Sequence, residues 1–306
     1  MKKVLVAMSG GVDSSAALVI LKEKYDVIGV TLKLHDGELE QDGIKTCCSL
    51  SDIDDARQVA ARFGIMHYVY NFKELFGEKV IRNFVESYER GVTPNPCIDC
   101  NRYIKFDGLL ERALSLGCDY VATGHYARVE YDEERGRWLL KKAVCADGEN
   151  DKDQSYVLYN LTQEQLSHIL FPLGSLTKPE VRSLAAKNGL LNAEKPDSQD
   201  ICFVPNGKYA EFIEGYTGKK SAPGNVTDTD GKIVGRHNGL INYTIGQRKG
   251  LGIAFGKPAY VVGKNVKDNT LIVGSEQELL SDTLIADELN WISIESLTEP
   301  ILCKAK

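Results

Sequence analysis

The sequence predicts an α/β protein whose N-terminal part is built on a mostly parallel sheet with helices on both faces. Short apolar runs alternate with segments of helical periodicity from residue 3 to residue 188, as in chains that join parallel strands by helices. A Ser-Gly-Gly turn at residues 9–11 links the first apolar run to the first helical segment. Beyond Pro205, glycine and β-branched residues dominate, which predicts a second, smaller domain rich in strands.

The first elements form a strand, a turn, a helix and a second strand. Residues 3–8 are apolar and bounded by glycine, so we expect a buried strand there. Residues 14–24 place alanine, leucine and isoleucine on one helical face, and residues 26–32 are a second apolar run. Ligands of such sheets bind beyond the carboxyl ends of the strands, where the Ser-Gly-Gly turn also lies.

The later elements continue this alternation. Apolar residues at helical spacing predict helices, several of which stop at a glycine, and short apolar runs predict strands. In chain order these are a helix at 54–63, a strand at 65–71, a helix at 73–90, a helix at 103–116, a strand at 119–123, a charged hairpin at 128–142, and helices at 162–170 and 178–188. We expect strands again at 289–295 and 300–306, and the last one stops in mid-strand, which suggests an incomplete final domain.

Composition narrows the functional classes. The net charge of −6 excludes a globally basic nucleic-acid binder but leaves room for a local basic face. No apolar run approaches the roughly 20 residues of a membrane helix, and the N-terminus lacks the apolar region and cleavage site of a signal peptide. We therefore expect a cytoplasmic protein with no membrane partner. Its eight cysteines are not expected to form a disulfide scaffold in a cytosolic chain of this size.

The turn after the first strand has the features of an anion site. Unpaired N–H groups and the positive end of a helix dipole meet there, and Gly10 and Gly11 let a ligand approach the backbone. Asp13 would repel phosphates unless a cation bridges them, so we expect Mg²⁺ at Asp13. The turn matches neither of the common glycine-rich nucleotide motifs. The alternative is a tight turn whose Asp and Ser residues only cap the helix.

Two cysteine-containing segments are the other candidates for chemistry. Cys97 and Cys100 lie in "TPNPCIDCN", whose prolines predict a rigid loop without helix, and Asn101 is expected to cap the helix that follows. Cys202 lies in a second polar, proline-bounded loop. Three interpretations stay open: buried packing residues, a zinc site that lacks the usual second cysteine pair, and sulfur chemistry by two thiols or by three thiolates around a cluster.

These motifs carry a resemblance to known families. The stretch "SGGVDS" resembles the pyrophosphate loop of the N-type ATP pyrophosphatases, which adenylate an oxygen of their substrate. Six ordered motifs resemble the tRNA-specific 2-thiouridylase family, which puts sulfur at position 2 of the wobble uridine: "MSGGVDSS", "TPNPCIDCNRYIKF", "ATGHYAR", "DKDQSY", "DSQDICFVP" and "GLINYTIGQRKGLGI". The resemblance implies an ATP pyrophosphatase domain at 1–205, a small central domain at 206–276 and the start of a C-terminal β-barrel at 277–306.

The resemblance also implies roles for particular residues. Cys100 matches the catalytic thiol, and Cys202 matches the cysteine that carries persulfide sulfur. Some members have Asp where this chain has Cys97, so the acid candidate moves to Asp99. The adenine-nucleotide site is expected to comprise Ala7, Met8, Ser9, Gly10, Gly11, Val12, Asp13, Ser14, Ser15, Leu32 and Gly124. The tRNA contacts are expected at Asn95, Pro96, Cys97, Lys152, Asp153 and Gln154.

A third thiol opens a second route for sulfur. Cys97, Cys100 and Cys202 resemble the ligands of iron–sulfur-dependent tRNA thiolases, in which three cysteines hold a [4Fe-4S] cluster with one open iron. We favour the persulfide route, in which adenylation of the C2 oxygen makes AMP the leaving group before sulfur attacks. The expected cofactors are ATP and Mg²⁺, with the cluster as the alternative. The expected partners are tRNA and a sulfur donor such as a cysteine desulfurase or a sulfur-relay protein.

Two functions of other classes compete with thiolation. An amidotransferase-type synthetase acting on a small molecule would need an ammonia source and neither Cys100 nor Cys202. A binding protein with a decayed pyrophosphatase fold would release no pyrophosphate, although the polar residues of the loop are intact. In the small domain, four residues are expected to face either tRNA phosphates or solvent: Arg236, His237, Arg248 and Lys249.

Overall fold

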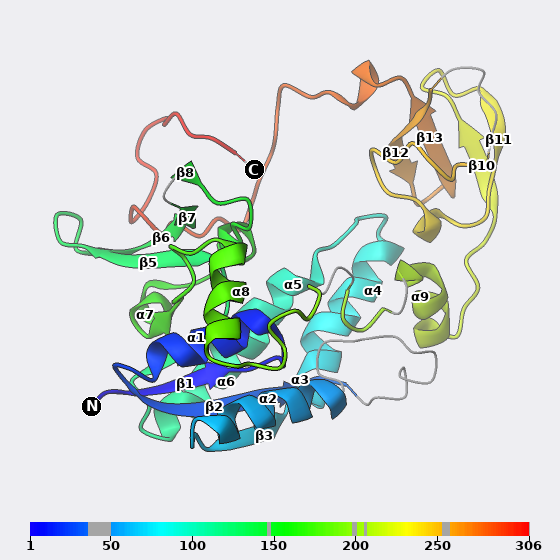
Figure 1. Ribbon diagram of the computed structural model, residues 1–306. Coiled ribbons are helices and arrows are strands. Elements are labelled where there is room, and N and C mark those ends of the chain that lie inside the picture. Colours follow the sequence, from blue (N-terminus) through cyan, green and yellow to red (C-terminus); the bar gives the residue numbers. More distant parts are fainter. Residues whose placement is uncertain (36–49, 146–147, 198–200, 205–206, 253–257, 306) are drawn as a thin grey trace. The chain divides into compact units, whose positions relative to one another are not determined.

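The computed structural model describes residues 1–306 except 36–49, 146–147, 198–200, 205–206, 253–257 and 306 (Figure 1). Cys47 and Cys48, which the sequence places in a loop, lie outside the described residues. The chain forms two compact units. Unit 1 comprises residues 1–80, 97–203 and 289–306, and unit 2 comprises residues 81–96 and 204–288.

A parallel five-stranded sheet forms the centre of unit 1, which confirms the predicted α/β class. Its strand order is β3-β2-β1-β4-β9, and every neighbouring pair is parallel. The strands are β1 (Lys3–Ala7), β2 (Asp26–Lys33), β3 (His67–Asn71), β4 (Tyr120–Ala122) and β9 (Ile169–Leu170). Strands β2 and β3 are added on one side of β1, and β4 and β9 are then added on its other side. The carboxyl ends of β1 and β4 therefore flank the switch point where parallel sheets bind ligands.

Three helices cover the face of the sheet that carries the side chains of Val4 and Val6. They are α1 (Val12–Leu21), α2 (Leu50–Arg62) and α8 (Lys178–Lys187), and their small and branched residues share one core with β1. The N-terminus of α8 has a capping box, in which the Thr177 hydroxyl accepts from the Glu180 N–H and the Glu180 carboxylate accepts from the Thr177 N–H. This cap fixes where α8 begins, and so where Lys178 lies.

The segment around Cys97 is helical, so the predicted loop is wrong. A continuous helical run comprises α5 (Pro96–Asp99), the π-helix η3 (Cys100–Gly108) and α6 (Leu109–Ser115). Pro96 is the first residue of α5, and proline is tolerated there because the first helical turn needs no N–H donor. Asn101 does not cap the helix. It is buried, and its amide nitrogen donates to the Val157 carbonyl at 3.1 Å.

The remaining elements of unit 1 follow the predicted order closely. Residues 73–89 are helical throughout, although residues from 81 onward belong to unit 2, and the charged hairpin is present. These and the shorter elements are α3 (Lys73–Phe76), η2 (Gly77–Ile81), α4 (Arg82–Glu89), β5 (Ala127–Asp132), β6 (Arg137–Lys142), β7 (Val144–Cys145), β8 (Gly148–Glu149), η4 (Ser155–Val157) and α7 (Gln163–Ser167). The predicted helix at 162–170 ends early, because residues 169–170 form β9 at the edge of the sheet.

Unit 2 contains a four-stranded sheet of order β11-β10-β13-β12, as the strand-rich composition predicted. Its elements are α9 (Tyr209–Thr217), β10 (Gly224–Thr227), β11 (Ile233–His237), η6 (Leu240–Asn242), β12 (Tyr260–Asn265), β13 (Thr270–Gly274) and η7 (Gln277–Leu279). Helix α9 was not predicted. His237 is fully buried, with Nδ1 accepting from the Gly239 N–H and Nε2 at 3.0 Å from the Asn269 carbonyl. The expectation that His237 faces phosphates or solvent is therefore wrong, whereas Arg236, Arg248 and Lys249 are exposed.

The strands predicted at 289–295 and 300–306 are absent from the described residues between 280 and 305. Residues 290–292, which belong to unit 1, instead contact its earlier residues through irregular backbone. The Asn290 amide donates to the Tyr159 carbonyl at 2.6 Å, and Arg137 donates to the Trp291 and Ile292 carbonyls. None of the helices in the described residues combines the length and apolar character needed to cross a bilayer.

Candidate active site

The loop between β1 and α1 is stiffened from within. Gly10 has φ +74°, a conformation that favours glycine, and Gly11 is the N-cap of α1. The hydroxyls of Ser14 and Ser15 each donate to the Gly11 carbonyl at 3.0 Å, and the Ser9 N–H donates to Ser14 Oγ at 3.1 Å. The two helix serines therefore brace the loop, whereas the sequence suggested that they donate to a ligand.

A second set of contacts holds the loop from outside. The Asn192 amide donates to the Gly10 carbonyl at 3.0 Å and to Ser15 Oγ at 2.9 Å. The Lys195 ammonium lies 3.3 Å from the Gly10 carbonyl and 2.6 Å from the carboxylates of both Asp52 and Asp55. Burial by itself lowers the pKa of Lys195, but the two carboxylates outweigh it and raise that pKa. Lys195 is therefore a charged brace between the loop and α2.

The loop makes a matched pair of glycine substitutions informative. A Cβ on Gly10 would lie 2.3 Å from the Asp52 carbonyl oxygen, whereas a Cβ on Gly11 would approach only Ser9 Oγ, at 3.5 Å. We expect Gly10→Ala to lower the free energy of unfolding by at least about 2 kcal/mol, from the left-handed backbone and the clash together. Gly11→Ala is expected to cost less than about 1 kcal/mol. Urea unfolding of the two variants checks this, and equal losses would contradict it.

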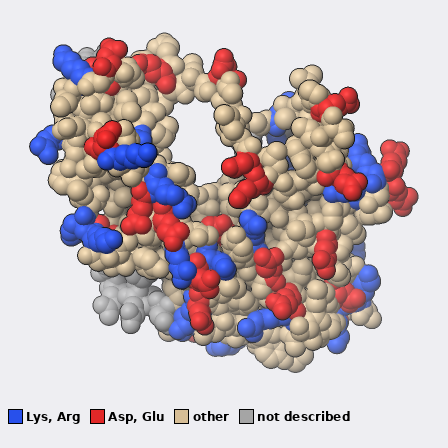
Figure 2. Space-filling view, turned by 180° about the vertical axis from the view of Figure 1, so that it is seen from behind, with Lys and Arg blue, Asp and Glu red and all other residues tan. Residues whose placement is uncertain are grey.

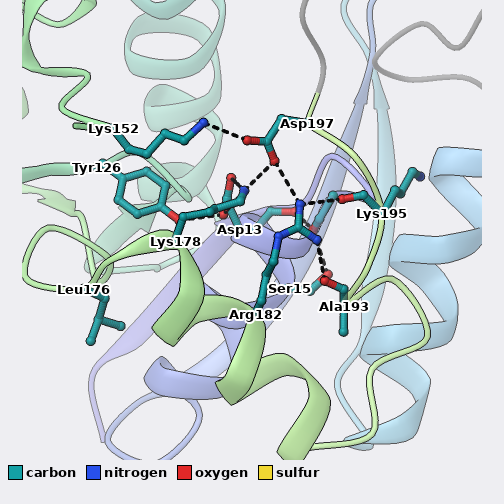
Figure 3. Close-up of polar contacts among 12 residues, drawn as sticks. Asp13, Ser15, Tyr126, Lys152, Leu176, Lys178, Arg182, Ala193, Lys195 and Asp197 are labelled. Carbon is teal, nitrogen blue, oxygen red and sulfur yellow. Dashed lines mark hydrogen bonds and ion pairs between the residues drawn. The ribbon is translucent and has the colours of Figure 1, made fainter. Parts of the chain in front are cut away.

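Asp13 lies at the centre of a network of opposite charges (Figure 3). Its carboxylate accepts from the Tyr126 hydroxyl at 2.8 Å and from the Lys178 ammonium, which is 2.8 Å from both oxygens. Lys178 also lies 2.6 Å from Asp197, which in turn pairs with Lys152 at 3.1 Å. Burial and the charge of Asp13 raise the pKa of Tyr126, so this phenol stays a proton donor at neutral pH.

Asp197 contacts α8 through a second residue, Arg182, in addition to Lys178. Arg182 approaches the Asp197 carboxylate at 3.5 Å and donates to the carbonyls of Ala193 and Lys195. Burial alone would raise the pKa of Asp197, but Lys178 and Lys152 lower it overall. Asp197 is therefore ionised at neutral pH, and it pairs with three cations: Lys178 and Arg182 from α8, and Lys152 from a separate segment.

These side chains line a pocket of about 380 Å³ at the switch point of the sheet. Its walls are Ser9, Gly11, Val12, Asp13, Asp52, Tyr126, Lys152, Gln154, Lys178, Lys195, Pro196 and Asp197. Three acidic and three basic side chains line it, so the pocket is polar and locally balanced in charge. Its volume lies in the range of ligand pockets, and the first turn of α1 offers it unpaired N–H groups.

The end of β4 forms the opposite side of this region. A Cβ on Gly124 would lie 2.8 Å from the backbone of Asp13 and Ser14, so only glycine allows this approach. The Tyr126 N–H donates to Gln154 Oε1 at 3.0 Å, and the Gln154 N–H donates to the Tyr126 carbonyl at 2.8 Å. Tyr126 thus connects Asp13, through its side chain, to Gln154, through its backbone.

His125 lies beside this wall. Its Nδ1 lies 2.6 Å from the Thr123 hydroxyl, and its ring contacts the rings of Phe106 and Phe171. Burial among these groups, together with the nearby charge of Lys105, lowers the pKa of His125 well below its usual value. His125 is therefore a neutral imidazole at neutral pH.

The two thiols of the predicted chemistry lie on elements that meet at α3. Cys100 is buried at the start of η3, which packs against α3. Cys202 is partly exposed on a turn, and the next residue, Phe203, is buried with its ring 5.6 Å from that of Phe76 at the end of α3. Cys97, at the start of the same helical run as Cys100, is exposed. Within the described residues, no group of three or more His, Cys, Asp or Glu side chains is placed to hold a metal ion.

The predicted nucleotide residues divide into two sets. Ser9, Gly11, Val12 and Asp13 line the pocket. The others are not among its walls: Ala7, Met8, Gly10, Ser14, Ser15, Leu32 and Gly124. Among the predicted tRNA residues, Lys152 and Gln154 line the same pocket, whereas the Asp153 carboxylate accepts from the Ala143 N–H and the Ser155 hydroxyl. Asn95, Pro96, Cys97 and the partly buried Asp99 are not among its walls.

Sequence reasoning missed half of the pocket. Tyr126 and Asp197 fall inside or beside quoted motifs, "ATGHYAR" and "DSQDICFVP", so their positions could have been suspected. Lys178 had no local signal beyond its place at the start of a helix. The missed wall residues are Asp52, Tyr126, Lys178, Lys195, Pro196 and Asp197.

Comparisons with known families cover nearly the whole chain. The family described as "tRNA methyl transferase HUP domain" matches residues 2–206. The family described as "tRNA methyl transferase PRC-barrel domain" matches residues 210–275. These descriptions name methyl transfer, whereas the curated relatives carry a different name.

The curated relatives align with this chain over most of their own length. The tRNA-specific 2-thiouridylase MnmA of Acetivibrio thermocellus is 53% identical over 308 residues, covering 100% of this chain and 85% of that protein. Proteins of the same name from Clostridioides difficile and Lachnoclostridium phytofermentans are 52% and 54% identical, covering 100% of this chain and 84% and 85% of theirs. Identity of this extent favours the relatives' name over the description of the two domain families.

Solved structures give a weaker likeness. The glutamine-dependent NAD+ synthetase of Acinetobacter baumannii has a TM-score of 0.36 and 17% identity, covering 61% of this chain and 28% of that one. A predicted subunit of tRNA methyltransferase from Methanocaldococcus jannaschii has a TM-score of 0.32 and 17% identity, covering 65% of this chain and 95% of that one.

Proposed function

Because this chain belongs to the tRNA-specific 2-thiouridylase family, we propose that its pocket binds ATP and that Cys100 and Cys202 deliver sulfur to the uridine activated there. The enzyme is a sulfurtransferase that uses ATP to thiolate uridine in tRNA at position 2. That the uridine is the wobble base is part of the proposal. The observation that carries it is that Asn192 and Lys195 clamp the nucleotide loop, while Phe203, next to Cys202, packs on α3.

The first step of the proposal is adenylation. The C2 carbonyl of uracil is a poor electrophile, and its oxygen is a poor leaving group. Attack of that oxygen on the α-phosphorus of ATP releases pyrophosphate and leaves an O-adenylated base, from which AMP can depart. The N–H groups at the start of α1 and the cations of the pocket favour the negative charge that gathers on the phosphates. The base must leave its stack to reach the pocket.

The second step is sulfur transfer. A persulfide on Cys202 is attacked by the Cys100 thiolate at its inner sulfur, so that a Cys100–Cys202 disulfide forms and hydrosulfide leaves. Hydrosulfide then attacks C2, and AMP carries away the original oxygen. An external thiol must reduce the disulfide before the next turnover. The convergence of both segments on α3 supports this step, and Asp99, one residue before Cys100, is proposed as the acid.

Magnesium fits the proposed site, whereas the cluster does not. Asp13 presents carboxylate oxygens, the ligands that Mg²⁺ prefers, to the same pocket as the loop. Bound there, Mg²⁺ would neutralise phosphate charge. The thiols of Cys97, Cys100 and Cys202 form no three-ligand group in the described structure, so we derive no step through a [4Fe-4S] cluster.

The tRNA surface is proposed from local side chains, because the whole molecule is acidic. On the face shown in Figure 2, Lys and Arg side chains lie among Asp and Glu side chains. Lys152 and Gln154 in the pocket, and the exposed Arg236, Arg248 and Lys249 in unit 2, are the proposed contacts. The identity of the sulfur donor and the cytoplasmic location stay predictions.

Pyrophosphate release and product analysis test the proposal together. The purified enzyme is incubated with ATP, a sulfide or persulfide source, and unmodified tRNA. We expect pyrophosphate release that depends on tRNA, and 2-thiouridine in the digested product by mass spectrometry. Release without tRNA would favour a small-molecule synthetase, and no release would favour a binding protein. Iron and sulfide analysis after anaerobic reconstitution should give less than one iron per chain; about four would reinstate the cluster.

A further inference from the structure

Lys178 occupies an unusual position in the pocket. It is the first residue of α8, 165 residues away from Asp13 in the chain. Its side chain is only 11% exposed, yet its ammonium lies at the pocket wall between the carboxylates of Asp13 and Asp197. Its ammonium makes three contacts to carboxylate oxygens, at 2.8, 2.8 and 2.6 Å (Figure 3). A ligand oxygen that binds Lys178 would therefore compete with these carboxylates.

The three lysines of the pocket differ in what they hold. Lys195 binds two carboxylates of α2 and a loop carbonyl, so it serves the loop's shape. Lys152 is half exposed and pairs with Asp197. Of these three lysines, Lys178 is the one whose ammonium contacts Asp13, the acidic residue in the first turn of α1, beside the N–H groups that suit an anion.

Phosphate oxygens bound at that turn would change the balance around Lys178. They would bring negative charge against Asp13, and the Lys178 ammonium is the positive charge in direct contact with that carboxylate. Asp197 can retain one contact to that ammonium while the contacts to Asp13 are exchanged. The arrangement thus supplies both a cation for the ligand and an anchor that keeps the cation in place.

We propose that Lys178 binds the pyrophosphate portion of ATP, exchanging its contacts with Asp13 for β- and γ-phosphate oxygens while Asp197 holds it. This inference rests on the proposed function, in which the pocket binds ATP. It makes Lys178 a residue that touches the leaving group of the adenylation step. The pairing with Asp13 is then the resting arrangement of the free enzyme.

Calorimetric titration of the full chain with Mg²⁺ and, in turn, ATP, pyrophosphate and AMP tests the inference. Lys178→Ala and Lys178→Met are expected to weaken ATP and pyrophosphate binding at least about tenfold, as for loss of one charge-assisted hydrogen bond. AMP lacks the β- and γ-phosphates, so its affinity should change less than about twofold. Lys178→Arg should recover part of the ATP affinity. Lys187→Ala removes the same charge from the far end of the same helix and should have no effect.

The possible results distinguish a failure of the Lys178 inference from a failure of the proposed function. Folded Lys178 variants, shown by unchanged thermal unfolding, that bind ATP and pyrophosphate normally would overturn the inference. So would an equal loss for AMP, because it would mean that the loop itself had been disturbed. A wild-type protein that bound neither ATP nor pyrophosphate would reject the proposed function and the inference with it.

Discussion

Replacing Cys100 or Cys202 by alanine is expected to lower tRNA thiolation more than about 1000-fold while adenylation continues, because each thiol is proposed to form or break a sulfur bond. Neither sulfur lines the pocket of Asp13, so tRNA-dependent pyrophosphate release should persist in both variants. Measuring 2-thiouridine and pyrophosphate in the same reaction gives both quantities. This split between the two steps is a stronger test than loss of product alone, which any damaged variant would show.

Two other cysteines provide matched controls. Cys145 is partly exposed and Cys303 is exposed, and neither lines the pocket. Their alanine variants should thiolate tRNA within about twofold of wild type. If Cys100→Ala or Cys202→Ala behaved like these controls, the persulfide proposal would have to be abandoned. If either one lost adenylation as well, the thiol would instead have a structural role in the nucleotide site.

Asp13→Asn is expected to reduce tRNA-dependent pyrophosphate release at least about 100-fold, the scale of losing one electrostatic group from an active site. Asparagine keeps the shape of the side chain and removes its charge. It would remove the proposed Mg²⁺ ligand and leave Lys178 paired with Asp197 alone. Initial rates at saturating ATP, tRNA and Mg²⁺ measure the effect.

The control for Asp13 is a surface carboxylate on the same unit. Asp54 is 62% exposed and pairs with Arg57, one turn along α2. Asp54→Asn should therefore leave the rate unchanged. A rate for Asp13→Asn above about a tenth of the wild-type value would show that its carboxylate is not part of the adenylation machinery.

The fold of unit 1 was predictable because its signals are local. Buried parallel strands are continuous apolar runs, and the helices that join them stop at glycines such as Gly64 and Gly117, both of which have positive φ. The errors came where a local rule was applied too broadly. Proline excludes the interior of a helix but not its first turn, so Pro96 begins α5. The alternation at 289–295 suggested a strand, but a strand needs a partner, which no local pattern supplies.

The features of the candidate site likewise fall into those that local sequence predicts and those that only tertiary packing assembles. The sequence alone determined that the loop with Asp13 and the two cysteine segments are candidates for chemistry. Each is a short run of residues whose functional groups indicate an anion site or a reactive thiol. Only the tertiary structure decided which donors meet Asp13, because the Tyr126 hydroxyl and the Lys178 ammonium come from 113 and 165 residues away. An ion pair depends on distances of a few ångströms between side chains, and those distances exist only after distant segments have packed.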